Sequence, residues 1–132
     1  AVADQDRTNA IFDDVGRQIV RVGHVRDLTV STGGALTSTA ETAIVASGGS
    51  GVFRDISHLR MTNKSTSVDV DVVVRSSSGS ATTYPFHLAA SGGITELYLP
   101  AWPQATAHSQ WTATLQVAGS TVAIHVIALS EV

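Results

Sequence analysis

Histidines are the residues of this chain most able to bind metal or move protons near neutral pH. The five histidines are His24, His58, His87, His108 and His125. No two of them are two or four positions apart, the spacings that bring two metal ligands to one face of a strand or a helix. We therefore expect no metal site and no cofactor.

Asp69 and Asp71 are two positions apart in a valine-rich segment, so a strand would place both carboxylates on one face. Such a pair can bind calcium or act as an acid and a base. It is also the usual composition of the solvated face of an amphipathic strand, which is the interpretation that we favour.

Nucleophilic and phosphate-binding motifs are missing from the sequence. No Gly-x-Ser-x-Gly motif is present, and Gly48-Gly49-Ser50-Gly51 lacks the Lys-Ser/Thr of a phosphate-binding loop. The absence of cysteine excludes disulfides and thiol catalysis, and it fits a protein made in a reducing cytoplasm. A Ser-His-Asp triad is recognised by geometry, so the sequence leaves that possibility open. The weight of these observations predicts that the protein is not an enzyme.

The charge pattern argues against nucleic acid as a partner, and the short apolar runs argue against a membrane-spanning helix. The net charge is −3, and the basic concentration at Arg17, Arg21 and Arg26 is interrupted by Asp27, which is too thin for binding a phosphate backbone. No apolar run reaches the ~18 residues of a transmembrane helix.

Charged residues make up 14% of the chain, against roughly 25% in an ordinary soluble domain, and 43% of the residues are hydrophobic. A chain of 132 residues is too short to bury all of them. We therefore predict a homo-oligomer, most simply a trimer, in which neighbouring subunits cover much of the surface.

The elements that position these residues are strands, because apolar residues alternate with polar ones over most of the chain. The clearest alternation runs from Val68 to Val74. The other expected strands lie within 19–30, 41–46, 52–62, 83–88, 94–99, 111–117 and 122–128. About eight short strands without a long helix predict an all-β fold, an antiparallel β-sandwich or jelly roll.

Glycine and serine clusters separate the strands and predict turns. We expect the polar stretch Ser31 to Ala40 to lead into the strand at 41–46, with a turn at Gly33-Gly34. Other turns are expected at 48–51, 63–65, 76–80, 91–93 and 119–120, and Pro85 is expected at a sheet edge or a bulge.

Residues 1–16 form a separate N-terminal arm in this interpretation, and residues 17–132 form the sandwich domain. The arm holds four aspartates and few apolar residues, so it cannot build a core of its own. It is either a short helix or frayed end, or a segment that becomes ordered on a partner. In the second case Ile11 and Phe12 are the partner-binding residues.

Trp102 lies between Pro100 and Pro103 and is expected on a stiff loop, where it is a candidate partner-binding residue together with Tyr98. The alternative is that its ring only covers one end of the sandwich. Trp111 is in register with Ala113 and Leu115, and we expect it in the core.

Three segments carry a resemblance to a known group of proteins. They are Ser38-Thr39-Ala40-Glu41-Thr42-Ala43-Ile44-Val45; Leu59-Arg60-Met61-Thr62-Asn63-Lys64-Ser65; and Leu99-Pro100 with Pro103-Gln104-Ala105, leading to Trp111-Thr112-Ala113-Thr114-Leu115. In order and spacing, from about Arg17 to Leu129, they resemble small β-sandwich structural proteins of tailed-bacteriophage particles.

The resemblance implies a capsid decoration (cement) protein without cofactor or activity, often a trimer, on the outer surface of the phage head. Its partner would be the major capsid protein, and it would stabilise the DNA-filled head. Two alternatives are a phage tail or host-binding tip protein, and a carbohydrate-binding or adhesin module with Trp102 and Tyr98 as its stacking platform.

Overall fold

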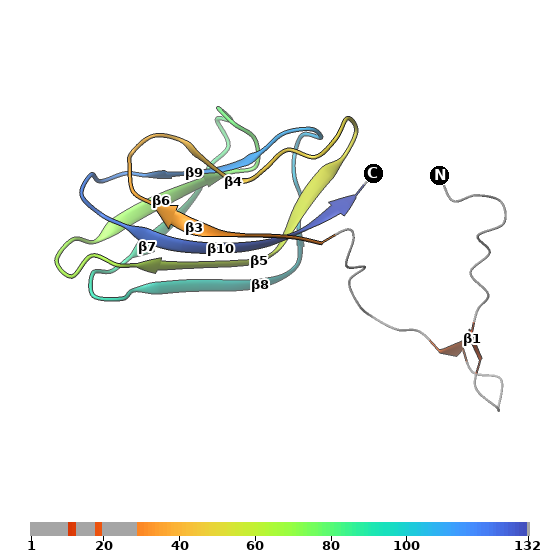
Figure 1. Ribbon diagram of the computed structural model, residues 1–132, viewed down its shortest axis with the longest axis horizontal. Coiled ribbons are helices and arrows are strands. Elements are labelled where there is room, and N and C mark those ends of the chain that lie inside the picture. The colour runs from red at the N-terminus through yellow and green to blue at the C-terminus, as the bar shows by residue number, and fades with distance from the viewer. Residues whose placement is uncertain (1–10, 13–17, 20–28, 132) are drawn as a thin grey trace.

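Two four-stranded antiparallel sheets pack face to face in the computed structural model, which describes residues 11–12, 18–19 and 29–131 (Figure 1). In spatial order the first sheet consists of β3 (Thr29–Leu36), β10 (Val122–Glu131), β5 (Phe53–Asn63) and β8 (Ile94–Trp102). The second consists of β4 (Thr42–Val45), β9 (Trp111–Leu115), β6 (Val70–Arg75) and β7 (Tyr84–Leu88). The prediction of an all-β antiparallel sandwich of about eight strands is confirmed.

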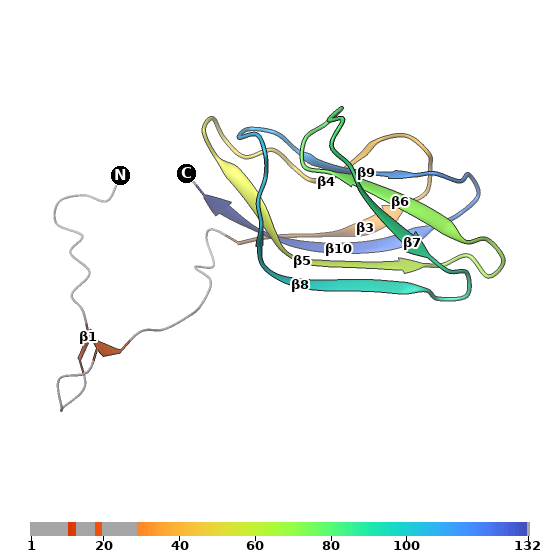
Figure 2. The same ribbon diagram turned by 180° about the vertical axis from the view of Figure 1, so that it is seen from behind.

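The strand order is nested. Neighbours in the first sheet include β3 with β10 and β5 with β8, and neighbours in the second include β4 with β9 and β6 with β7. The first four strands of the sandwich therefore pair with the last four in reverse order, which is the wrapped arrangement of a jelly roll. β7 leads through a short turn into β8, and the chain crosses there from the second sheet to the first (Figure 2).

The core lies between the sheets and follows the predicted alternation. Val70, Val72 and Val74 are buried while Asp71 between them is exposed. Trp111 is fully buried, and its indole N–H donates a hydrogen bond of 2.6 Å to the carbonyl of Arg54. The core position expected for Trp111 is confirmed.

The turn predicted at Gly33-Gly34 is wrong. Both glycines lie inside β3, where they pair with His125 and Ile124 of β10. A Gly-Gly pair is a common turn signal, but here β10 supplies a complete antiparallel partner and the glycines extend an edge strand. The predicted polar lead-in from Ser31 therefore begins as a strand.

Pro85 lies on β7, an edge strand of the second sheet, where it pairs with Val73 of β6; of the two predicted positions, edge and bulge, it occupies the edge. A proline fits there because an edge strand leaves one row of backbone groups without a ladder partner. The predicted turns at 48–51, 76–80, 91–93 and 119–120 each contain a glycine with positive φ.

Asn63 links the end of β5 to the connection before β6 and to the end of β7. Its fully buried side-chain amide donates hydrogen bonds to the carbonyls of Val68 (2.8 Å) and Leu88 (3.1 Å), and its Oδ1 accepts one from the amide of Ser65 (2.9 Å). The turn predicted at 63–65, between β5 and the valine-rich β6, is thus built around a satisfied buried amide.

Two short strands precede the sandwich. β1 (Ile11–Phe12) pairs with β2 (Gln18–Ile19) in antiparallel register, so the boundary predicted at residue 17 falls between two paired strands. The strand residues expected at Val20, Val22, Val25 and Leu28 lie outside the described residues, as does His24. Within the described part of the chain, no helix has the length and apolar character needed to cross a membrane.

Candidate functional site

The outer face of the first sheet presents three rows of side chains that run across all four strands. Each row takes one residue from β3, β10, β5 and β8 in that order. The rows are Ala35, Ala123, Thr62 and Ile94; Gly33, His125, Arg60 and Glu96; and Ser31, Ile127, His58 and Tyr98. We call these twelve residues the outer face. Arg60 and Glu96 are the only Lys, Arg, Asp or Glu residues among them.

A hydrogen-bonded group at the β8 side of the outer face fixes its most exposed ring. Tyr98 is 75% exposed, its ring stacks on His58, and its hydroxyl donates a hydrogen bond of 2.7 Å to Glu96 Oε1. Nε2 of His58 lies 3.2 Å from the same carboxylate oxygen. Hydrogen bonds lower the pKa of Glu96, that from Tyr98 most strongly and that from His58 second. The hydrogen bond to Glu96 in turn raises the pKa of Tyr98. Glu96 is therefore held ionised and Tyr98 protonated.

Two histidines far apart in the sequence meet in the middle of this face. The rings of His58 and His125 lie edge to face with 5.8 Å between centroids, and Nε2 of His125 is 2.9 Å from Oγ of Ser31. A serine beside a histidine is the first part of a nucleophile–base pair. Glu96, however, binds His58 rather than His125, so the described contacts do not assemble a Ser-His-acid triad.

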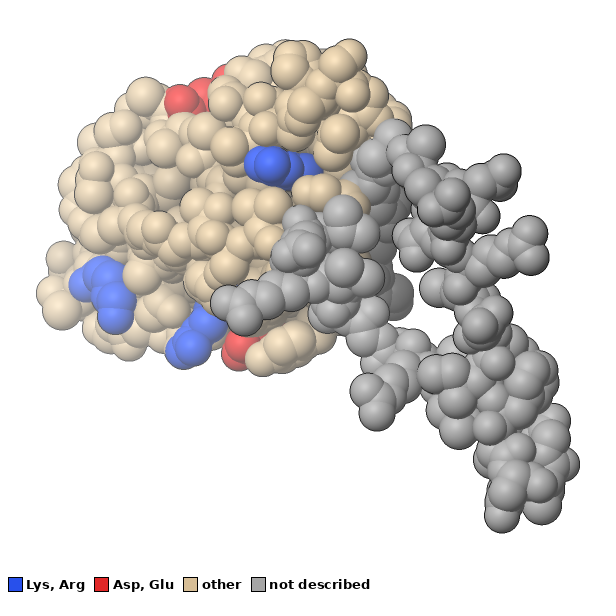
Figure 3. All heavy atoms as spheres, turned by 45° about the vertical axis from the view of Figure 1, so that its right-hand side comes forward, with Lys and Arg blue, Asp and Glu red and all other residues tan. Residues whose placement is uncertain are grey.

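A hollow of about 250 Å³ lies on the same side of the sheet, lined by Arg60, Thr62, Lys64, Ala123, Ile124 and His125. Among the described residues, the side chains of Arg60 and Lys64 have no hydrogen-bond partner and no opposite charge within ion-pair distance, although the backbone N–H of Lys64 donates to the carbonyl of Thr121. Arg54 and Arg75, by contrast, are hydrogen-bonded to the carbonyl of Ala46 and the hydroxyl of Thr114. In Figure 3 basic side chains stand as separate patches on a surface that is otherwise largely uncharged.

The two aromatic residues predicted as a joint binding platform lie on opposite faces of the sheet. Tyr98 pairs with His58 on the outer face, whereas Trp102 pairs with Ile56, which is fully buried in the core. The register shifts between these pairs, because three residues of β8 oppose the single residue Ser57 of β5. Trp102 therefore ends a strand rather than occupying a free loop.

Trp102 packs against the core and also lines an open groove. Its ring lies 4.4 Å from that of Tyr84, 5.3 Å from Trp111 and 6.3 Å from Phe86 between centroids. The groove has a volume of about 350 Å³ and lies between β7 and β8, lined by Tyr84, Pro85, Phe86, Leu97 and Trp102. Trp102 is thus mainly a packing residue with one accessible side.

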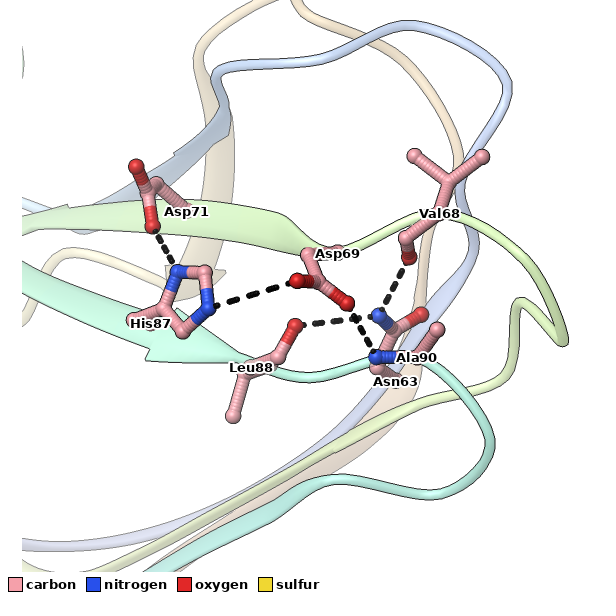
Figure 4. Close-up of polar contacts among 7 residues, drawn as sticks. All are labelled: Asn63, Val68, Asp69, Asp71, His87, Leu88 and Ala90. Carbon is pink, nitrogen blue, oxygen red and sulfur yellow. Dashed lines mark hydrogen bonds and ion pairs between the residues drawn. The ribbon is translucent and has the colours of Figure 1, made fainter.

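On the second sheet His87 lies between the two aspartates that the sequence singled out (Figure 4). Its Nδ1 is 2.6 Å from Asp71 Oδ1, and its Nε2 is 3.8 Å from Asp69 Oδ2. The hydrogen bond to Asp71 raises the pKa of His87. All three side chains are more than half exposed, which agrees with a solvated strand face. No group of three or more potential ligands in the described ranges is arranged to hold a metal ion.

Ile11 and Phe12 lie in β1, and among the described strands β1 pairs with β2 alone. The contacts of their side chains lie outside what the structure describes. Sequence reasoning missed the contribution of Ser31, His58, Arg60, Glu96 and His125 to the outer face. Alternation marked His58, Arg60, Glu96 and His125 as strand residues, whereas Ser31 was expected in a polar stretch outside the strands. Nothing in the alternation showed that the strands carrying these residues are neighbours.

Comparison with known proteins yields no family: no protein-family model matches the chain, and no curated protein does so.

Proposed function

We propose that this chain is a non-enzymatic structural protein of a tailed-bacteriophage particle, a decoration protein that binds the major capsid protein on the outer surface of the head. It would be made in the host cytoplasm, assemble as a homo-oligomer such as a trimer, and stabilise the DNA-filled head. The single observation that carries the protein-binding part of this proposal is the composition of the outer face.

The outer face has the character of an interface rather than of a solvated sheet surface. Tyr98 is 75% exposed and Ile94 is 54% exposed, and charged side chains are sparse. Interface centres are depleted in charge and enriched in tyrosine and arginine. Because the side chains at Gly33, Ala35 and Ala123 are small or absent, a partner can approach the β3 and β10 side of the sheet closely.

The size of the face suggests how it would bind. Three rows across four strands cover a patch of roughly 20 Å by 20 Å. This is about half of the ~800 Å² per partner in a standard stable interface. One contact of this size is weak, whereas a repeated array of contacts on a shell binds strongly by multivalency.

The assignment to a phage particle rests on the resemblance of the three segments described above, and a sandwich by itself does not specify a function. Two of the segments coincide with structural features that fit it. The first includes β4, and the second ends β5 at the Asn63 turn before the valine-rich β6.

Purification of DNA-filled particles with quantification of this chain tests the proposal. A decoration protein is expected in hundreds of copies per particle. A handful of copies would support the alternative of a tail or host-binding tip protein, and complete absence from particles would reject both.

A second candidate is a carbohydrate-binding or adhesin module, favoured by the exposed ring of Tyr98, which Glu96 and His58 hold in place. An exposed aromatic ring can stack on a sugar. Binding on a glycan array that is lost in Tyr98→Ala would support this function over the first.

A further inference from the structure

The charge of this protein is divided unequally along the chain. Residues 1–16 contain Asp4, Asp6, Asp13, Asp14 and the single base Arg7, which gives them the whole formal charge of −3. The remaining residues contain equal numbers of acidic and basic side chains and are formally neutral. An acidic segment is therefore attached to a neutral sandwich.

Among the described Lys and Arg side chains, those of Arg60 and Lys64 form neither a direct hydrogen bond nor an ion pair, whereas those of Arg54 and Arg75 are hydrogen-bonded to neutral oxygens. These two side chains, Arg60 and Lys64, line the hollow beside the outer face, and His125 lies next to them. Glu96, the cross-strand neighbour of Arg60, attracts it without direct contact, and the carboxylate of Glu96 is already hydrogen-bonded to Tyr98 and His58. This hollow suits a carboxylate-bearing partner.

Apolar side chains stand next to these cations. Arg60 lies in the middle row, and the flanking rows end in Ile94 and Tyr98 at the β8 edge. Residues 11–14 read Ile-Phe-Asp-Asp, so two apolar residues are followed at once by two acidic ones. The occupant needs apolar groups beside acidic groups, and this segment of the chain has both in adjacent positions.

We propose that the N-terminal segment of a second copy of this chain lies on the outer face, with its aspartates beside Arg60 and Lys64 and with Ile11 and Phe12 against Ile94 and Tyr98. This inference rests on the proposed homo-oligomer and names the contact that would form it. Among the described strands, β1 pairs with β2 and with no strand of the sandwich.

The length of the connecting segment and the area of the outer face are both consistent with exchange of the N-terminal arm between copies of the chain. The nine residues from 20 to 28 span up to ~30 Å when extended, enough to cross to a neighbouring subunit. An exchanged arm adds its own contact area to a face that is too small alone for a stable interface. Reciprocal exchange between identical subunits repeats the same contact at each copy and closes an oligomer.

Photo-cross-linking of the full-length protein without particles tests the proposal. Phe12 is replaced by the photoreactive benzoylphenylalanine, and copies carrying light and heavy nitrogen isotopes are mixed, irradiated and mapped by mass spectrometry. We expect mixed light–heavy cross-links from position 12 to residues 58–64 or 94–98. Cross-links confined to one isotope would show that the arm binds its own subunit, and cross-links elsewhere or none would reject the surface; each of these results overturns the proposal.

A pair of charge variants tests the acidic contact. Arg60→Gln with Lys64→Gln should lower the mixed cross-link yield roughly threefold to tenfold, the range expected for losing two exposed ion pairs. Thr82→Glu with Thr83→Glu changes the net charge equally on an exposed loop and should leave the yield unchanged. Equal yields from the two double variants would contradict the charge contact, provided that both melt like the unmodified protein.

Failure of this inference and failure of the proposed function are distinguishable. A protein present in hundreds of copies per particle but without exchange between arms would keep the decoration role and lose this contact. Cross-links to the outer face in a protein that is absent from particles would keep this contact and reject the decoration role.

Discussion

The phenol ring of Tyr98 lies parallel to the imidazole of His58, with 4.6 Å between centroids and 4° between ring planes. The two residues are cross-strand partners on β8 and β5, and Glu96 binds both of them. Tyr98 is thereby held in one orientation although most of its surface is exposed, which lowers the entropy that a partner must remove on binding.

Tyr98→Ala should therefore weaken partner binding while leaving the fold intact. An exposed substitution changes the free energy of unfolding by within about 0.5 kcal/mol, whereas a tyrosine that acts as a binding hot spot contributes ~2 kcal/mol or more to binding. Co-sedimentation with particles and a melting curve measure the two effects, with Thr82→Ala as an exposed control on the far loop. Wild-type binding to particles by Tyr98→Ala would contradict a binding role for the outer face.

The two tryptophans should differ in their contribution to stability. Trp111→Ala removes a fully buried ring and its hydrogen bond to Arg54 and should cost about 3–5 kcal/mol. Trp102→Ala removes a partly buried ring and should cost roughly half as much, more than a residue on a free loop would. Chemical denaturation measures both values. A larger loss for Trp102 would mean that the groove side of the core carries more packing than the contacts show.

Asn63→Ala should destabilise the protein by about 2–4 kcal/mol, because it leaves the buried carbonyl of Leu88 and the partly buried carbonyl of Val68 without their donor. Lys64→Ala changes the adjacent exposed residue in the same turn and serves as the control. Similar unfolding free energies for the two variants would show that water replaces the amide at this junction.

His87 should titrate above its ordinary pKa because it is hydrogen-bonded to Asp71. A histidine whose pKa is raised by folding stabilises the protein fully below its unfolded pKa near 6.5, and this contribution is lost as the pH rises through the folded pKa. Relative to His87→Gln, the native protein should thus gain more in melting temperature at pH 5 than at pH 8. An NMR titration that places the imidazole midpoint below 6.5 would contradict this sign.

Metal removal should leave the fold unchanged. No described group of side chains has the arrangement of a metal site, and the sequence shows no local ligand spacing. Treatment with a chelator is expected to leave the melting temperature the same within error. A drop that added zinc or calcium reverses would point to a site that includes residues outside the described ranges.

The sequence by itself determined the class of fold and most of the strands. Alternation of apolar and polar residues is a local property, because successive side chains of a strand point to opposite faces. Val70 to Val74 and Trp111 to Leu115 were therefore predictable as strands with their buried sides. Local signals failed where pairing with a distant strand decided the structure. Gly33 and Gly34 form a strand because β10 pairs with them, and Trp102 is the last residue of a strand because it pairs with β5.

The tertiary structure alone decided which residues share the outer face. His58 and His125 are brought together because β5 and β10 are neighbours in the nested order, and nothing in their separation along the chain indicates this. The β5–β8 register shifts at Ser57. Tyr98 on one side of this shift faces outward and Trp102 on the other side faces inward, so the two rings that the sequence predicted to act together are separated. Strand pairing and register depend on contacts between distant segments, so they are fixed by the packing of the whole sandwich and not by the pattern of any one strand.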